Sequence, residues 1–150
     1  MLKKIFIILI FFKLTNCGYT PIYSNIDNTN FKINKIILNG DRNVNNYLKT
    51  NLQKHISKNQ NEGYELETTA KFDKIVMTKD SAGKVSIYKL ILNITFNIKT
   101  ENFNETYNFE EEFLMETEND KFSQKTHETS IMQNLTNKIY EDFILKVSDK

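Results

Sequence analysis

The residue with the clearest chemistry is Cys17, because it is the only cysteine in the chain and its thiol can be covalently modified. It follows a basic start, Met1 to Lys4, and an apolar block, Ile5 to Phe12, which Lys13 closes. A membrane-spanning helix needs about 20 apolar residues, so this shorter block is typical of an export signal that is removed. A lone cysteine in an exported protein has no intramolecular disulfide partner, which leaves an intermolecular disulfide, an unmodified thiol or covalent modification.

The residues around Cys17 favour covalent modification. Leu14-Thr15-Asn16-Cys17 resembles a bacterial lipobox, although Asn16 stands where Gly, Ala or Ser is usual. The resemblance implies a thiol that carries diacylglycerol, cleavage before Cys17 and a new amino terminus open to acylation; a lasting anchor needs more than one acyl chain. The residue after Cys17 is Gly18. In enterobacterial lipoproteins, which this segment resembles, an Asp at that position is linked to retention in the inner membrane. Because Gly18 stands there instead, transport to the outer membrane is permitted. The alternative is a plain secreted protein with a chance cysteine near its cleavage site.

Cleavage before Cys17 divides the 150-residue chain into a signal peptide, residues 1–16, and a mature chain of 134 residues. Residues 17–30 contain Pro21 and are predicted to form an extended tether behind the lipidated cysteine, and residues 31–150 have the length of a single domain. The net charge falls from +1 to −2 on cleavage, because three lysines leave with the signal and no acid does. Since the mature chain has no basic tract, nucleic acid is not an expected partner.

Side chains that could support catalysis or metal binding are scattered along the sequence. His55 and His127 have neither a histidine four residues away nor a cysteine at zinc spacing, so both are predicted to be surface residues. Neighbours on a strand face opposite sides, so of Glu110, Glu111 and Glu112 only the first and third share a face, and a solvated strand is favoured over paired catalytic carboxylates. The sequence has no Gly-rich phosphate loop and no Gly-x-Ser-x-Gly turn. We expect no catalytic residue, no metal and no cofactor, and predict that the protein is not an enzyme.

Cations near one predicted turn indicate a different chemistry. Lys79 and Lys84 flank a hairpin loop, Lys71 and Lys74 lie further down the preceding strand, and Arg42 is the only arginine in the chain. Such side chains can pair with the phosphates of a lipid head group through charge-assisted hydrogen bonds. Lysine is abundant throughout this chain, so the alternative is that these cations serve solubility alone.

The positions of apolar residues predict a strand and then a helix at the start of the domain. Residues 31–38 alternate and then become continuously apolar, and Asn39-Gly40-Asp41 ends this strand. Asp41 or Asn43 can cap the helix that is predicted over 43–58. Its apolar residues recur at spacings of three and four and line one side: Val44, Tyr47, Leu48, Leu52 and Ile56.

Three longer strands and a second helix follow. Residues 64–77 alternate with a phase slip that predicts a bulge near Asp73, and residues 88–98 and 103–115 alternate as well. Residues 123–147 predict an amphipathic helix, whose buried stripe is Ile131, Leu135, Ile139, Phe143 and Val147. One apolar sheet face can then meet two apolar helix stripes. The sequence therefore predicts an α+β fold with two helices packed on one face of a four-stranded sheet, in the order β-α-β-β-β-α.

The stretch Cys17-Gly18-Tyr19-Thr20-Pro21-Ile22-Tyr23, together with this order of elements and the mature length, resembles the LPS-assembly lipoprotein LptE family in its alphaproteobacterial form. The resemblance implies a lipoprotein anchored on the periplasmic side of the outer membrane. There it plugs the lumen of the LptD β-barrel translocon, supports the assembly of that barrel and contacts lipopolysaccharide on its way to the cell surface. Lys79, Lys84 and Arg42 are then the candidate contacts to lipopolysaccharide phosphates.

The distribution of polar residues fits such a role. A barrel lumen is polar, and the predicted helices carry Asn- and Lys-rich outer faces over a separate apolar core. The alternative is a general envelope lipoprotein that binds a lipid or a peptide. That alternative predicts an apolar cavity between the sheet and the helices.

Overall fold

The computed structural model describes residues 31–58, 63–100 and 103–148. The predicted signal peptide, Cys17 and the tether through residue 30 lie outside these described residues. In chain order the elements are β1 (Ile33–Gly40), α2 (Arg42–Leu52), the short 3-10 helix η2 (Gln53–His55), β2 (Tyr64–Lys79), β3 (Val85–Thr100), β4 (Phe103–Glu116) and α3 (Lys121–Ser148). Apart from η2, which continues α2, this is the predicted order β-α-β-β-β-α.

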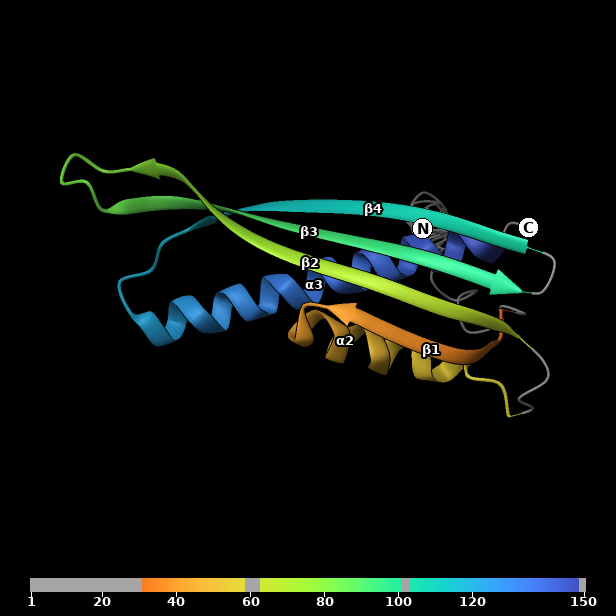
Figure 1. Cartoon of the computed structure of the whole chain (residues 1–150). Coiled ribbons are helices and arrows are strands. Elements are labelled where there is room, and N and C mark those ends of the chain that lie inside the picture. The colour runs from red at the N-terminus through yellow and green to blue at the C-terminus, as the bar shows by residue number, and fades with distance from the viewer. Residues whose placement is uncertain (1–30, 59–62, 101–102, 149–150) are drawn as a thin grey trace, which may run out of the picture.

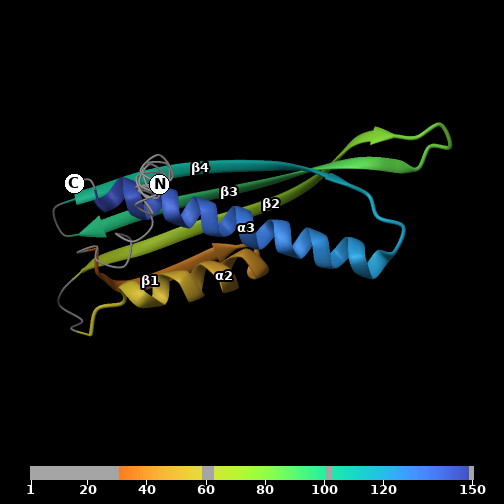
Figure 2. The same ribbon diagram turned by 180° about the vertical axis from the view of Figure 1, so that it is seen from behind.

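The four strands form one mixed sheet in the order β1-β2-β3-β4. β1 is parallel to β2, whereas β2, β3 and β4 pair antiparallel. Both helices lie against the same face of the sheet and leave the other face open (Figure 1), and the view from behind shows α3 running along the strands with α2 beside it (Figure 2). The predicted α+β fold is therefore confirmed. Among the residues that the structure describes, no helix combines the length and the apolar character needed to cross a membrane.

The apolar core lies between the sheet and the two helices. β3 supplies alternate buried side chains, as its sequence pattern predicts: Leu90, Leu92, Ile94, Phe96 and Ile98. From α3, Phe143 stacks face to face on Phe96, with the ring centroids 4.0 Å apart. The predicted stripe of α3 packs here too, although Val147 at its end is only partly buried. The alternation along the strands thus determines which face of the sheet the helices cover.

The sharp reversal from β1 into α2 depends on two residues. Gly40 has a φ of +92°, in the left-handed region that favours glycine. Asp41 caps α2, as predicted, because its Oδ1 accepts hydrogen bonds from the backbone N–H of Asn43 at 2.9 Å and of Val44 at 3.0 Å. The backbone N–H of Asp41 donates to the Ala70 carbonyl at 2.8 Å, which attaches the turn to β2.

The first predicted helix is shorter than expected. α2 gives way to η2 before residue 58, and the chain then leaves Ile56 exposed, in an isolated parallel bridge with Ile33. His55, the last residue of η2, is buried, so the prediction of a surface histidine there is wrong. Its burial is tolerated because its Nε2 lies 2.8 Å from the hydroxyl of Tyr140 in α3 and so has a polar partner. His127 is exposed, as predicted.

The predicted bulge near Asp73 is wrong in position. Asp73 pairs regularly with Ile91, and the irregularities of the β2–β3 register lie later, between Val76 and Lys79. Residues 75–77 are all exposed, near the end of the hairpin that extends past the helices (Figure 1). Because neither face of the strand is buried there, the apolar residues need not keep the phase that the core imposes earlier in β2.

Candidate functional site

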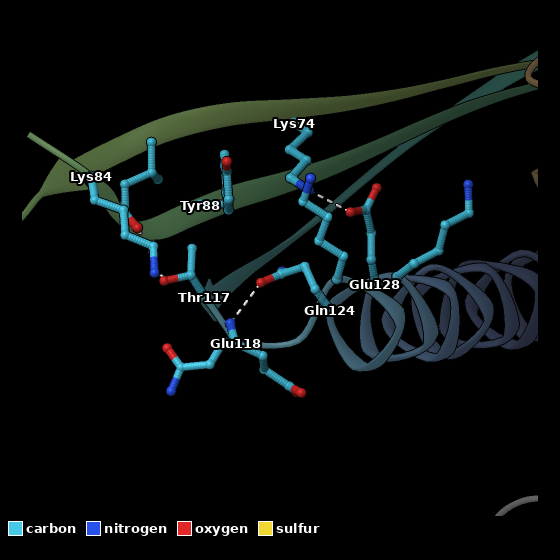
Figure 3. A pocket seen from close by; sticks show the side chains of 11 residues that line it. Lys74, Lys84, Tyr88, Thr117, Glu118, Gln124 and Glu128 are labelled. Carbon is cyan, nitrogen blue, oxygen red and sulfur yellow. Dashed lines mark hydrogen bonds and ion pairs between the residues drawn. The ribbon is translucent and has the colours of Figure 1, made fainter.

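A pocket of about 610 Å³ lies toward the hairpin end of the molecule, between the β2–β3 hairpin, the β4–α3 connection and the first turns of α3. Figure 3 shows side chains from all three segments turned toward this space. The hairpin contributes Lys74, Lys84, Val85 and Tyr88; the connection contributes Thr117, Glu118 and Asn119; α3 contributes Lys121, Gln124, Lys125 and Glu128. Four lysines thus surround one opening.

One of these lysines already has a carboxylate partner. Lys74 Nζ lies 2.5 Å from Glu128 Oε2 and 4.2 Å from the centroid of the Tyr88 ring. The ion pair joins β2 to α3 across the pocket (Figure 3), and the ring adds a cation–π attraction. Both side chains of the pair are less than a third exposed, so salt screens their attraction less than that of a surface pair. Lys74 therefore serves to hold the pocket together.

Hydrogen bonds fix the β4–α3 connection against the hairpin. Thr117 Oγ1 donates to the Val85 carbonyl at 3.0 Å, and the Thr117 N–H donates to the Ser86 carbonyl, also at 3.0 Å. The Glu118 N–H donates to Gln124 Oε1 at 2.6 Å, which ties the connection to α3. The walls of the pocket are therefore positioned before any ligand binds.

Three lysines around the pocket have no ion pair within the ranges that the structure describes: Lys84, Lys121 and Lys125. Lys121 and Lys125 are four residues apart in α3 and so lie on the same side of the helix. The start of α3 also adds the positive end of the helix dipole. Cations that converge on an open pocket in this way can bind an oxyanion such as a phosphate group.

Asp120 caps α3 at the edge of this site, and we expect acid to loosen that helix start. Its Oδ2 accepts a hydrogen bond from the Ser123 N–H at 2.7 Å, and hydrogen bonding to Ser123 holds the pKa of Asp120 below its ordinary value. Because the pKa of Asp120 is lower in the folded chain than in the unfolded chain, its carboxylate stabilises the start of α3 fully above the unfolded pKa of about 3.9. This stabilisation is lost as the pH falls through the pKa of the folded state.

The titration of Asp120 can be followed by NMR of its carboxyl group. Asp120→Asn keeps a capping oxygen but cannot titrate, so this variant should lose the acid-dependent change in the first turn of α3. A carboxyl pKa at or above the ordinary aspartate value would contradict the expectation.

The structure separates the cations that the sequence singled out. Lys84 lines the pocket. Lys79 is the last residue of β2, exposed at the hairpin tip, and it is not part of the lining. Arg42 is the first residue of α2 and lies exposed beside the end of β1, also outside the lining. Cys17 lies outside the described residues.

Sequence reasoning missed Lys121 and Lys125 as site residues. The second helix was predicted to begin at Ser123, which left Lys121 outside it, whereas α3 begins at Lys121. The available signal was the four-residue spacing of these two lysines, which places them on one helix face. Nothing local in the sequence places that helix face opposite a hairpin much earlier in the chain.

The three consecutive glutamates of β4 point to alternate faces, as predicted. Glu111 Oε2 pairs with Lys138 Nζ of α3 at 2.7 Å on the helix side, whereas Glu112 pairs with Lys89 of β3. Glu111 and Glu112 therefore form separate ion pairs on opposite sides of the sheet. Within the described ranges, no group of three or more His, Cys, Asp or Glu side chains is placed to hold a metal ion.

No family model matches this sequence, and no curated protein matches it in sequence. Solved structures nevertheless resemble it. Rare lipoprotein B from Shewanella oneidensis aligns with a TM-score of 0.58 at 12% identity, over 75% of this chain and 92% of that one. Lipoprotein B from Nitrosomonas europaea aligns at 0.57 and 10% identity, over 79% and 83%. A minor lipoprotein from Acinetobacter baumannii aligns at 0.52 and 19% identity, over 75% and 94%.

These alignments cover most of both chains in each comparison, so the similarity extends beyond a shared pair of elements. At such low identity they show the arrangement of the chain and not the role of any residue. The chain therefore has the fold of the rare lipoprotein B and minor lipoprotein structures, which is the LptE-like fold that the sequence resemblance implied.

Proposed function

We propose that this chain is a lipid-anchored protein of the outer membrane that occupies the lumen of an LptD-like β-barrel. In that position it supports the assembly of the barrel and the export of lipopolysaccharide to the cell surface. The observation that carries the proposal is the open face of the sheet, which is polar over most of its length although the opposite face builds an apolar core.

Side chains on the open face pair with one another across the strands. Lys99 Nζ lies 2.9 Å from Glu67 Oε2, and Thr95 Oγ1 donates to Asn108 Oδ1 at 2.8 Å. The hydrogen bond from Lys99 and its charge hold the pKa of Glu67 below its usual range. A face of this kind needs no apolar cover, and it suits a barrel lumen, which is polar.

The lipid anchor in this proposal is Cys17. The three structures compared above are each described as a lipoprotein, and Leu14-Thr15-Asn16-Cys17 resembles a lipobox. Residues 18–30 would then connect the membrane to the described domain, with a reach of at most about 45 Å. In this proposal the domain lies on the periplasmic side, within reach of a barrel in the same membrane.

Lipopolysaccharide phosphates are the proposed ligands of the pocket. Lys84, Lys121 and Lys125 surround it without ion pairs among the described residues, and a phosphate can accept several charge-assisted hydrogen bonds at once. Lys79, at the hairpin tip, is not part of the pocket lining and is a separate candidate contact to lipopolysaccharide phosphates. Arg42, which begins α2, is not part of the proposed site.

Removing two pocket lysines should weaken lipopolysaccharide binding. We expect the Lys121→Ala/Lys125→Ala variant to bind purified lipopolysaccharide about ten-fold less tightly, because two charge-assisted contacts are lost. The matched control is Lys49→Ala/Lys146→Ala, which removes two exposed lysines outside the pocket. Binding that falls equally in both variants would contradict a specific site and indicate a general effect of charge.

Crosslinking in intact cells tests the barrel. A photoreactive residue in place of Asn97, in the open face, should crosslink to an outer-membrane β-barrel that mass spectrometry identifies as LptD-like. The same position in a Cys17→Ser background, where the thiol cannot be acylated, should crosslink much less. Recovery of the lipidated protein as a free monomer from gently solubilised membranes, with no barrel crosslink, would overturn the proposal.

The alternative function gains no support from the packing. A carrier of a lipid or peptide was predicted to hold its ligand in an apolar cavity between the sheet and the helices. In the described part of that layer, Phe96 and Phe143 stack in direct contact and Leu48 is fully buried beside α3 and the sheet. The pocket described above opens outside this layer and is lined largely by charged side chains.

A further inference from the structure

The β2–β3 hairpin ends in a two-stranded ribbon that projects past the rest of the sheet (Figures 1 and 2). β4 pairs with β3 only from Ile87 onward, so among the described residues the ribbon has no third strand. Its turn is fixed by Asp80, whose Oδ1 accepts hydrogen bonds from the N–H of Ala82 at 2.9 Å and of Lys84 at 2.8 Å. Thr78 and Ser86 are joined across the ribbon by a 2.9 Å hydrogen bond. The projection is therefore pre-formed.

Large apolar side chains are exposed at the base of this ribbon. Ile75, Val76 and Met77 follow one another in β2 and are 46%, 46% and 51% exposed. Consecutive residues of a strand point to opposite faces, so both faces of the hairpin present apolar surface. On β4, Leu114 lies in the same cross-strand row as Ile75 and is 60% exposed. Exposed apolar residues that gather in one place mark an interaction surface.

Lysines surround these apolar residues. The segment 74–89 contains four lysines and one aspartate, and that aspartate already accepts the hydrogen bonds of the turn. Two of the lysines pair with glutamates of α3 and β4. Lys79 and Lys84, on either side of the turn, have no ion pair within the part of the chain that the structure describes. The ribbon is thus both apolar and cationic, whereas the mature chain as a whole is slightly acidic.

We infer that this ribbon docks on the surface of an anionic lipid bilayer. Residues 75–77 enter the interfacial layer, and Lys79 at the hairpin tip faces the lipid phosphates. Apolar side chains beside lysines are the combination with which peripheral elements bind such surfaces. A second copy of this chain does not fit, because two cationic ribbons repel each other. An uncharged apolar partner would leave the lysines without an opposite charge.

The ribbon and the start of the described chain lie at opposite ends of β2. The described chain begins beside Ile33, which pairs with Tyr64 at the start of β2, whereas the ribbon is at the other end of this 16-residue strand. A strand of that length extends for about 50 Å. Docking of the ribbon is therefore a membrane contact made far from the start of the described domain, and it requires neither acylation of Cys17 nor a surrounding barrel.

Vesicle flotation tests this inference. The mature chain, residues 17–150, made without acylation, should float with vesicles that contain phosphatidylglycerol and stay behind with vesicles of phosphatidylcholine alone. Lys79→Ala should weaken the partition about five-fold, as expected for one lysine near an anionic surface. Ile75→Ser/Met77→Ser should weaken it about ten-fold, because the apolar residues that enter the interface are lost. All three residues are exposed, so the variants should keep the circular dichroism spectrum of the parent chain.

Controls separate the ribbon from the pocket. Lys49→Ala, on α2, should leave flotation unchanged. Loss of flotation in Lys121→Ala/Lys125→Ala but not in Ile75→Ser/Met77→Ser would overturn docking by the ribbon and assign the binding to the pocket. Failure of the parent chain to float, or unchanged flotation of Ile75→Ser/Met77→Ser, would overturn bilayer docking. Loss of flotation on adding inorganic phosphate at constant ionic strength would overturn it as well, because binding would then belong to a phosphate site. None of these outcomes bears on the barrel crosslink, which tests the proposed function independently.

Discussion

Phe143→Ala should lower the free energy of unfolding by about 3–5 kcal/mol, the usual cost of removing a fully buried phenylalanine. The Phe143 side chain is completely buried in α3 and stacks on Phe96 of β3. Its ring also meets the edges of Phe31, Tyr107 and Phe109, with centroids 5.7 to 6.4 Å away. The substitution therefore leaves a cavity where α3, the sheet and the start of the described chain meet. Urea unfolding followed by circular dichroism would measure the loss.

Phe122→Ala is the matched control, because it makes the same chemical change in the same helix. Phe122 lies in the first turn of α3 and is 79% exposed. Its removal should change the free energy of unfolding by no more than about 0.5 kcal/mol. Similar losses in the two variants would contradict the placement of Phe143 at the centre of the core.

Gly40→Ala should be the second severe change, with a loss of more than about 2 kcal/mol. A Cβ built at Gly40 would lie 1.9 Å from the Ala70 carbonyl oxygen, and that atom belongs to the backbone of β2 and cannot turn aside. The φ of +92° adds the strain of a conformation that side chains with a Cβ disfavour. Because the Asp41 N–H donates to the same carbonyl, relief of the clash would also disturb the start of α2. Thermal unfolding would report the change as a lower midpoint.

Gly83→Ala separates the strain from the clash. Gly83 lies in the hairpin turn with a φ of +79°, but a Cβ there would meet no atom within 4 Å. This variant should lose only the cost of the left-handed conformation, about 1–2 kcal/mol. If Gly40→Ala lost no more than Gly83→Ala, the close approach of β1 to β2 at Ala70 would be contradicted.

The order of elements could be predicted because it depends on local features of the sequence. In β3, every second residue from Leu90 to Ile98 is apolar, and this period alone requires a strand with one buried face. The cap at Asp41 was predictable for the same reason, since an N-cap contacts only the next few residues. The period of the apolar residues then defines the face on which two helices can pack.

Predictions made from local sequence features were wrong where the structure depends on residues that are distant in the chain. The apolar pattern extended the first helix through Ile56, but the chain instead turns at η2 and buries His55 against Tyr140, which is 85 residues away. The bulge was misplaced because the apolar residues lose their phase at residues 75–77, where the helices no longer cover the strand, whereas the pairing of β2 with β3 becomes irregular only between Val76 and Lys79. Neither fact is encoded within the segment that it affects.

The residues of the candidate site likewise fall into those that the local sequence indicates and those that only the tertiary structure brings together. Lys84 could be singled out from the sequence because it flanks a recognisable turn. Its partners in the pocket, Lys121 and Lys125, could not, because their position depends on where β4 ends and on the direction in which α3 returns along the sheet. The ion pair between Lys74 and Glu128 likewise exists only once that return is made.

The sequence by itself determined the α+β order, the sheet face that is apolar and the cysteine that can carry a lipid, because each follows from residues close together in the chain. Only the tertiary structure decided which lysines converge on one pocket, which histidine is buried and how far the hairpin projects. These depend on the packing of segments that are distant in sequence, and periodicity carries no information about distances between such segments.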